Sequence, residues 1–231
     1  MFHGGIQKTS LVDYPGHICD VVFLAGCNFR CPYCHNPELV LGGEHLSSYQ
    51  WADVLDGIAK RAHVLDGVCI SGGEPTLHPE LAQWCAQIRE LGLLVKLDTN
   101  GTSPELLGQL LADDLVDYVA MDIKAPPVKY EQVTRTKVDL KSVERSVDLL
   151  LAGGISYEFR TTVPRSLLSE EDLLMIGQWI NGASCYVLQR YRPEHHLDLE
   201  FESDERDSEA WLLTMQEKLK PYADSIKVRG L

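Results

Sequence analysis

The sequence predicts an α/β fold in which a parallel sheet is covered by helices on the outside. Two observations predict it. Apolar stretches of strand length alternate six times with longer stretches in which apolar residues recur at helical spacing. Polar and glycine-rich residues follow directly after several of the apolar stretches, which is where parallel sheets place their chemistry. Judged from these patterns alone, the six units form either an open doubly wound sheet or a curved, incomplete barrel.

The predicted strands are short and apolar, and they cover residues 19–26, 67–73, 93–101, 117–124, 156–163 and 185–191. The predicted helices cover residues 47–65, 78–92, 103–114, 139–154, 169–182 and 208–223. Pro79 and Pro104 suit the first turn of a helix, and Ser169 followed by three acids marks a helix start. Gly92 and Gly153 suit helix C-terminal caps. Strand–helix–strand connections of this kind are nearly always right-handed.

Length and charge narrow the class of protein. At 231 residues we expect one domain, 1–231, with a core at about 17–192 and a C-terminal acidic segment, helix and final strand at 193–231. The net charge of −13 argues against nucleic-acid binding. The apolar stretches are too short for a membrane helix, and the N-terminus lacks the pattern of a signal peptide. We therefore expect a cytoplasmic protein with no membrane partner.

Three of the seven cysteines are clustered in GCNFRCPYCHN (26–36), as Cys27, Cys31 and Cys34. Thiolates at such short spacing bind zinc or an iron–sulfur cluster. Zinc needs a fourth protein ligand, and the chain contains no second C-x2-C pair to provide it. A [4Fe–4S] cluster needs no fourth ligand here, because three thiolates hold three irons and leave the fourth open to a substrate. The spacing therefore favours a reactive cluster over a closed zinc site.

The remaining ligand candidates fit a zinc site poorly. His35 is adjacent to Cys34 and cannot readily complete the same tetrahedron, and His17 and Cys19 lie upstream, before or at the start of the first strand. The four scattered cysteines have apolar or helical surroundings and are expected to be buried small hydrophobes; they are Cys19, Cys69, Cys85 and Cys185.

Two motifs together resemble the radical S-adenosylmethionine (SAM) superfamily. The first is C-x3-C-x2-C with Tyr33 before the last cysteine, and the second is SGGEP (71–75) after the second strand. The resemblance implies an incomplete (β/α)6 TIM-like barrel, a [4Fe–4S] cluster on the three cysteines, and SAM bound at the open iron. A closed metal-binding module without enzymatic activity is the alternative that these motifs disfavour.

The stretch VDYPGHICDVVFLAGCNFRCPYCHNPELV (12–40), with LDTNG (97–101) and MDIK (121–124), resembles the activating enzymes of glycyl radical enzymes. The resemblance covers residues 4–192 and extends to the activating proteins of anaerobic ribonucleoside-triphosphate reductase. It implies reductive cleavage of SAM, a glycyl radical formed on that partner, and an electron donor such as flavodoxin or ferredoxin. The alternatives are activation of a formate-lyase type enzyme and small-molecule chemistry like that of the deazaguanine synthases.

The resemblance also implies roles for individual residues. Gly72, Gly73 and Glu74 would lie along the amino group of SAM, and Tyr33 would support the adenine. Five further positions would hold SAM or an associated monovalent cation, namely Asp98, Asn100, Asp122, Lys124 and Arg160. Simpler interpretations exist for some of them, because Asp98–Gly101 suits a turn, Lys124 suits an exposed side chain, and Arg160 suits an ion pair with Glu158 or Asp122.

Other candidates are less specific. Asp13, just before the first strand, is expected to help hold the incoming glycine loop, unless VDYPG is a plain turn. Gln189 and Arg190 end the sixth strand and are further candidates for the site. His195 and His196 suggest a metal site but have no third ligand nearby. The G-x-I-x-G-x-x-E pattern of many superfamily members is absent near the fifth strand, so no adenine contact is assigned there.

Overall fold

The computed structural model describes residues 1–42, 46–192, 196–198, 200–201 and 208–230. The chain packs as two compact units, one made of residues 1–28, 38–99 and 103–119, and one made of residues 29–37, 100–102 and 120–231. The expectation of a single domain over 1–231 stays a prediction.

The first unit is built on strands with the order β3-β1-β2-β4-β5. Their bounds are β1 (Phe2–Ser10), β2 (Cys19–Leu24), β3 (Ser47–Tyr49), β4 (Gly67–Gly72) and β5 (Leu94–Thr99). As predicted, β2, β4 and β5 are parallel. They are apolar along most of their length because both of their faces are covered.

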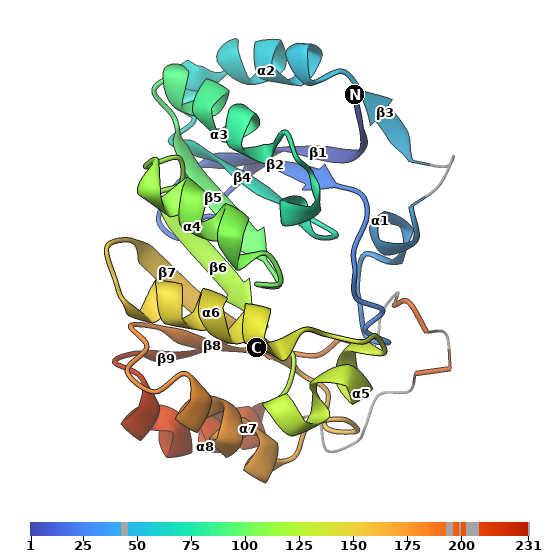
Figure 1. The fold of residues 1–231 in the computed structure, drawn as a ribbon, viewed down its shortest axis with the longest axis vertical. Helices are drawn as coiled ribbons and strands as arrows, with labels where there is room; N and C mark the ends of the chain where they lie inside the picture. Colours follow the sequence, from blue (N-terminus) through green and yellow to red (C-terminus); the bar gives the residue numbers. More distant parts are fainter. Residues whose placement is uncertain (43–45, 193–195, 199, 202–207, 231) are drawn as a thin grey trace. The chain divides into compact units, whose positions relative to one another are not determined.

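Helices accompany these strands in the predicted order, except that the short helix α1 was not predicted. Their bounds are α1 (Pro37–Leu41), α2 (Trp51–Ala59), α3 (Leu81–Glu90) and α4 (Pro104–Ala112), with short 3-10 turns at Ala62–Val64 and Pro75–Leu77. Helix α3 packs against β5 and against α2 (Figure 1). Pro104 occupies the first turn of α4, as expected.

Two strands of this unit were not predicted. β1 runs antiparallel to β2, and β3 pairs with β1 through His3 and Ser48, in a segment that was expected to be helical. The helix expected over 47–65 therefore begins only at Trp51. Gly4 explains part of the difference, because a Cβ at this position would lie 3.0 Å from the carbonyl carbon of Phe23 and closer still to its oxygen. Glycine thus permits a close strand approach that apolar patterning does not show.

The second unit has the strand order β6-β7-β8-β9. β6 (Tyr118–Asp122) begins in the first unit and ends in the second, and it is followed by β7 (Ser156–Val163), β8 (Tyr186–Arg190) and β9 (Ile226–Arg229). The β7–β8 and β8–β9 pairs are parallel. β9 is the final strand that was expected in the C-terminal segment.

The helices of this unit are α5 (Tyr130–Thr134), α6 (Leu140–Leu151), α7 (Glu170–Trp179) and α8 (Glu209–Leu219), with 3-10 turns at Pro127–Lys129 and Lys220–Tyr222. α7 and α8 lie side by side, and α8 packs against β8 and β9 (Figure 1). α5 is a short helix that was not predicted.

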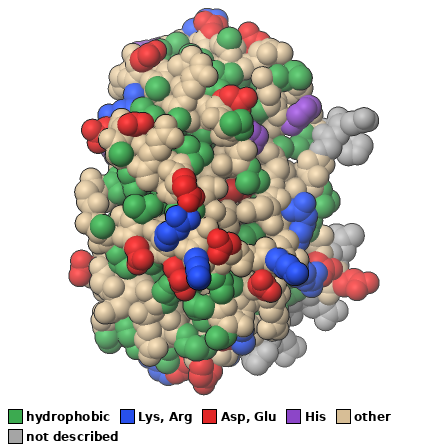
Figure 2. Space-filling view, viewed as in Figure 1, with side chains coloured by type: hydrophobic (Ala, Val, Ile, Leu, Met, Phe, Trp, Pro, Cys, Tyr) green, Lys and Arg blue, Asp and Glu red, His purple; other side chains and the backbone are tan. Residues whose placement is uncertain are grey.

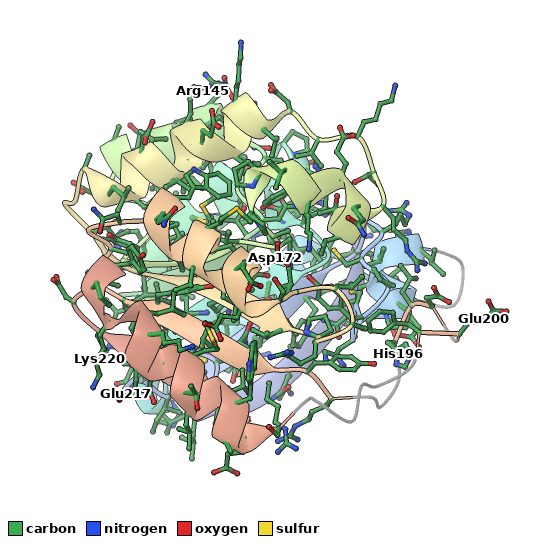
Figure 3. All side chains as sticks on the ribbon, turned by 90° about the horizontal axis from the view of Figure 1, so that it is seen from below. Arg145, Asp172, His196, Glu200, Glu217 and Lys220 are labelled. Atoms are coloured by element: carbon green, nitrogen blue, oxygen red, sulfur yellow. The ribbon has the colours of Figure 1, made fainter. Side chains whose placement is uncertain are left out.

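Helix α7 begins as the sequence predicts. The Ser169 hydroxyl accepts a hydrogen bond from the backbone N–H of Asp172, and the Asp172 carboxylate accepts one at 2.8 Å from the backbone N–H of Ser169. Lys129 adds an ion pair to Asp172 at 2.6 Å. Burial alone would raise the pKa of Asp172, but the bonds from Lys129 and Ser169 outweigh it and lower that pKa. Asp172 is labelled in Figure 3.

The strands do not form a closed barrel. Within the described part of the chain, β3 pairs only with β1 and β9 pairs only with β8. This confirms the predicted α/β class and the incomplete barrel. None of the helices in the described ranges is long and apolar enough to cross a membrane. On the face shown in Figure 2, acidic and basic side chains are interspersed rather than gathered by sign.

Candidate cofactor site

The backbone after β2 is held in place before it reaches the first cysteine. The Gly26 N–H donates to the carbonyl of Leu39 at 2.7 Å, and Gly26 has a φ of +95°, which favours glycine. The His78 ring nitrogen Nε2 lies 3.0 Å from the carbonyl oxygen of Ala25. Cys27 follows, is partly exposed and forms no disulfide. Sequence reasoning missed His78, because nothing in HPELAQW sets this histidine apart from a helix-start residue.

Gly72 and Gly73 bring the end of β4 against this backbone. The Gly73 N–H donates to the carbonyl of Leu24 at 2.8 Å. A Cβ on Gly73 would lie 2.6 Å from the carbonyl carbon of Gly26, and one on Gly72, whose φ is +124°, would lie 3.0 Å from the carbonyl carbon of Leu24. Both positions therefore require glycine, so that two stretches of backbone can approach closely.

The Glu74 carboxylate is buried and accepts hydrogen bonds from other residues of the protein. Its side chain is 1% exposed. Its Oε1 accepts hydrogen bonds from the hydroxyls of Thr76 and Thr99, at 2.6 and 2.7 Å, and so connects the ends of β4 and β5. The Glu74 N–H donates to the carbonyl of Gly26 at 2.7 Å. A contact between Glu74 and SAM, as the resemblance implies, is therefore expected through its backbone carbonyl.

Asp98 lies near the end of β5 and is bonded on both oxygens. Its Oδ2 accepts a hydrogen bond from the Ser71 hydroxyl at 2.9 Å, and its Oδ1 is contacted by the Lys96 ammonium group. Lys96 is itself 2% exposed. Sequence reasoning treated Lys96 as part of a strand and gave it no role, although its spacing of two from Asp98 places both side chains on one face.

In the second unit, helix α5 holds the start of the loop that carries Cys31 and Cys34. The Arg30 N–H donates to the carbonyl of Thr134 at 2.8 Å. The rings of Phe29 and Tyr130 meet edge to face, 6.1 Å apart. The Cys34 N–H donates to the carbonyl of Cys31 at 3.1 Å, which closes a tight turn between the two thiols.

A stretch of the C-terminal segment lies along the same loop. The N–H groups of Leu197 and Asp198 donate to the carbonyls of Cys34 and Pro32, at 3.1 and 3.0 Å. The Asp198 carboxylate pairs with Arg135 at 2.5 Å. Part of the acidic segment therefore supports the cysteine loop, which the sequence did not indicate.

Tyr33 is buried at 3% exposure, with its ring 6.3 Å from that of Phe201. Its hydroxyl is buried without a hydrogen-bond partner in the described residues. Burial raises the pKa of Tyr33 well above its usual value, and the neighbouring Cys31 raises it further. The role in supporting adenine stays a prediction.

Asp122, Lys124 and Arg160 form one charged group, made by the end of β6, the residues just after it and the middle of β7. Lys124 Nζ lies 2.9 Å from Asp122 Oδ2, and Arg160 Nε donates to Asp122 Oδ1 at 2.8 Å. Burial opposes the charge of Lys124, but Asp122, Cys31 and Tyr33 raise the pKa of Lys124 well above its usual value. The ammonium therefore stays charged at neutral pH. The expected ion pair of Arg160 forms with Asp122, whereas Glu158 pairs with Arg229 at 2.6 Å.

Asn100 forms the local turn that the simpler interpretation predicts. Its Oδ1 accepts hydrogen bonds from the backbone N–H and the hydroxyl of Thr102, at 3.1 and 2.7 Å. Gly101 follows with a φ of +75°, and a Cβ there would lie 2.9 Å from the sulfur of Met121. A contact of Asn100 with SAM stays a prediction.

The structure gives less support to the less specific site candidates from the sequence. Gln189 and Arg190 are partly exposed at the end of β8. His195 lies outside the described residues. His196, labelled in Figure 3, packs edge to face on Tyr191, and its ring nitrogens are buried without a partner in the described part of the chain. In the described ranges, no three His, Cys, Asp or Glu side chains are placed to hold a single metal ion.

Asp13 lies at the opposite end of β2 from the cysteine loop. Its carboxylate accepts a hydrogen bond from the Ser10 hydroxyl, which in turn accepts from the backbone N–H of Asp13 at 3.1 Å. Burial raises the pKa of Cys19, the first residue of β2, to about 11, and the charge of Asp13 contributes to that rise. Leu11 and Val12 beside it are 70% and 81% exposed.

Comparison with known proteins decides the family. Residues 21–174 match the radical SAM superfamily. The chain belongs to this superfamily. A protein of Methanocaldococcus jannaschii, named as a candidate glycyl-radical enzyme activating enzyme, is 33% identical over 98% of this chain and 95% of its own length. The 7-carboxy-7-deazaguanine synthase of Methanospirillum hungatei is 34% identical over 74% of this chain and 70% of its own length.

Solved structures support the fold at low sequence identity. SuiB of Streptococcus suis bound to S-adenosylmethionine has a TM-score of 0.67 at 14% identity, over 88% of this chain. This chain spans only 48% of SuiB. QueE from Escherichia coli has a TM-score of 0.59 at 12% identity, over 100% of this chain and 94% of its own. The chain is thus a radical SAM enzyme with the fold that the sequence predicted.

The described residues fit the cofactors that the superfamily implies. Cys27, Cys31 and Cys34 lie within eight residues of one another in the sequence, and none of them forms a disulfide. The glycines after β4 leave backbone unobstructed by side chains. The partly buried cations Lys124 and Arg160 suit a site for an anionic group. A [4Fe–4S] cluster on the three thiols and SAM beside it agree with this donor set.

Proposed function

We propose that this chain is an activating enzyme that generates a glycyl radical on a partner enzyme, with anaerobic ribonucleoside-triphosphate reductase as the first candidate. The similarity to the Methanocaldococcus protein supports the proposal best, because it extends over 98% of this chain at 33% identity. The pyruvate formate-lyase-activating enzyme of Clostridium pasteurianum supports it over a shorter range, at 36% identity over 52% of this chain.

The proposed roles of the residues follow from their positions. Cys27, Cys31 and Cys34 would hold the cluster, and the backbone at Gly72–Glu74 would bind the amino group of SAM. Lys124 and Arg160, both held by Asp122, would neutralise its carboxylate. When bound, the cluster and SAM supply a carbon radical able to remove a hydrogen atom from glycine. The chain itself orients these groups and excludes water.

Asp13 is proposed to contact the partner enzyme at the end of β2 opposite the cysteine loop, away from the place where the glycine loop must reach SAM. Asp13 stands near the first residue of β2, whereas Cys27 follows its last residue, so the length of one strand separates them. The exposed side chains of Leu11 and Val12 offer an apolar contact beside this carboxylate. An exposed apolar pair next to a polar group is typical of a protein-binding surface.

The chain is further proposed to act in the cytoplasm, with flavodoxin or ferredoxin as electron donor. None of the seven cysteines forms a disulfide, which agrees with a reducing compartment. The test of the activase function is anaerobic incubation of the loaded protein with SAM, a reductant and a purified anaerobic ribonucleotide reductase. A glycyl radical signal in electron paramagnetic resonance supports the proposal. A signal only with a formate-lyase type enzyme would reassign the partner.

A second candidate is small-molecule chemistry of the deazaguanine-synthase kind. The identity of 34% over 177 residues to the Methanospirillum enzyme favours it. The same loaded protein would then form 7-carboxy-7-deazaguanine from the substrate of that enzyme in the absence of any partner protein. Product formation from this substrate, with no radical on either candidate partner, would replace the activase proposal.

A further inference from the structure

A lysine lies in the middle of β5, where the neighbouring side chains are apolar. Lys96 is 2% exposed, and its partner in the register with β4 is Cys69. Its Nζ lies 3.6 Å from the Cys69 sulfur and contacts Asp98 Oδ1. Burying an ammonium group is costly unless an anion compensates it. The compensating group is the Asp98 carboxylate, which is two residues along the same face of the strand.

The Asp98 carboxylate is thereby already neutralised within the chain. One oxygen is contacted by the Lys96 ammonium and the other accepts from the Ser71 hydroxyl at 2.9 Å. A monovalent cation bound to this carboxylate would stand beside a second positive charge in a poorly solvated place, where like charges repel strongly. The donor set around Asp98 therefore does not fit a separate cation.

Asp122, in the second unit, is the other carboxylate expected to hold the cation, and it too is paired with cations of the chain. Asp122 is contacted on one oxygen by Lys124 at 2.9 Å and on the other by Arg160 at 2.8 Å. Its charge is balanced by two cations of the chain. For both carboxylates expected to hold an associated cation, side chains of the protein thus supply the compensating positive charge.

We infer that Lys96 takes the place of the monovalent cation: it holds Asp98 by a buried ion pair, so that SAM binding by this enzyme requires no alkali cation. Lys96 is a positioning residue, since it acts through Asp98. The inference rests on the SAM-binding site that the proposed function uses, and it does not depend on the identity of the partner. If the ion pair were purely structural, its removal would destabilise β5 but would not make the SAM affinity of the variant depend on the cation in the buffer.

The test measures the affinity of the full-length, cluster-loaded protein for SAM by anaerobic calorimetry. The buffers contain chloride salts of potassium, sodium or tetramethylammonium at one ionic strength. We expect the wild-type dissociation constant to be the same in all three. Lys96→Met should bind SAM more weakly in tetramethylammonium, and potassium or sodium should tighten it at least about fivefold, the lower range of coupling between linked sites. Lys96→Arg should behave as the wild type.

Lys60→Met is the matched control, because Lys60 forms an exposed ion pair with Asp56 on α2 and should leave SAM binding unchanged. Wild-type binding that is several-fold tighter in potassium or sodium than in tetramethylammonium would overturn the inference. Binding by Lys96→Met that matches the wild type in every buffer would overturn it as well.

A second measurement covers the case in which Lys96→Met does not fold. Equilibrium dialysis of the wild-type protein with thallium(I), a potassium analogue, should show no stoichiometric site in the presence of SAM, and one bound ion per chain would contradict the inference. The experiments use no partner enzyme. A missing glycyl radical would therefore count against the proposed function alone, and cation-dependent SAM binding against this inference alone.

Discussion

Replacing Gly73 by alanine tests the close backbone approach on which the cysteine loop depends. The new Cβ would lie 2.6 Å from the carbonyl carbon of Gly26 and closer still to its oxygen, so the two stretches must separate by about 1 Å. The separation breaks two buried hydrogen bonds, from the N–H groups of Gly73 and Glu74 at 2.8 and 2.7 Å. Each of the two groups left unsatisfied costs about 1–3 kcal/mol, so the free energy of unfolding should fall by about 2–6 kcal/mol.

The assay is urea denaturation of the cluster-free protein, together with iron content per chain after anaerobic reconstitution. Iron content should also fall, because Cys27 follows the displaced Gly26 directly. Gly57→Ala in α2 is the control, since a Cβ there meets no atom within 4 Å. It should keep the iron content and raise stability by about 0.4–1 kcal/mol. A Gly73→Ala variant as stable and as fully loaded as the wild type would refute the reasoning.

Two further predictions concern Asp13 and Lys129. Asp13→Ala should reduce radical formation on the partner, while SAM cleavage without the partner stays unchanged. Asp53→Ala, on the exposed face of α2, is the control. Equal loss of both activities in Asp13→Ala would rule out partner binding by Asp13. Lys129→Met should lower the free energy of unfolding at pH 7 by about 1–2 kcal/mol, because it removes the bond to the buried Asp172 carboxylate. Because the pKa of Asp172 is lowered in the folded protein, this contribution is present above the usual aspartate pKa of about 3.9 and is lost as the pH falls through the folded value. Urea titrations at pH 7 and near pH 3 check it, and a difference between the variants that does not shrink at low pH would contradict the assignment.

Much of the fold was predictable because the parallel strands are buried on both faces. Residues 67–73 and 156–163 were expected as strands from their apolar character, and the structure has β4 at Gly67–Gly72 and β7 at Ser156–Val163. β1 was missed because its glycines and its three consecutive exposed residues, Gln7–Thr9, hide the alternation of a strand. β3 was missed because Ser47–Tyr49 has no strand signal of its own and is ordered by pairing with β1.

The residues of the candidate site were found from motifs, but their partners were not. Glu74 was expected in the site, yet the bond from Thr99 to its carboxylate joins residues 25 positions apart. The contacts of Leu197 and Asp198 with the cysteine loop join segments far apart in the chain, which periodicity cannot show. Lys96 was within reach of the sequence, because a lysine in an apolar strand two residues before an aspartate indicates a buried ion pair.

The central claim is that Cys27, Cys31 and Cys34 hold a reactive cluster that cleaves SAM. The most direct measurement is anaerobic reconstitution with iron and sulfide, reduction, addition of SAM and assay of 5′-deoxyadenosine. We expect the product with the wild type and its loss in Cys31→Ala, whereas Cys85→Ala, which changes a buried cysteine of α3, should retain it. A fully loaded wild-type protein that forms no 5′-deoxyadenosine, alone or with candidate partners, would contradict the account.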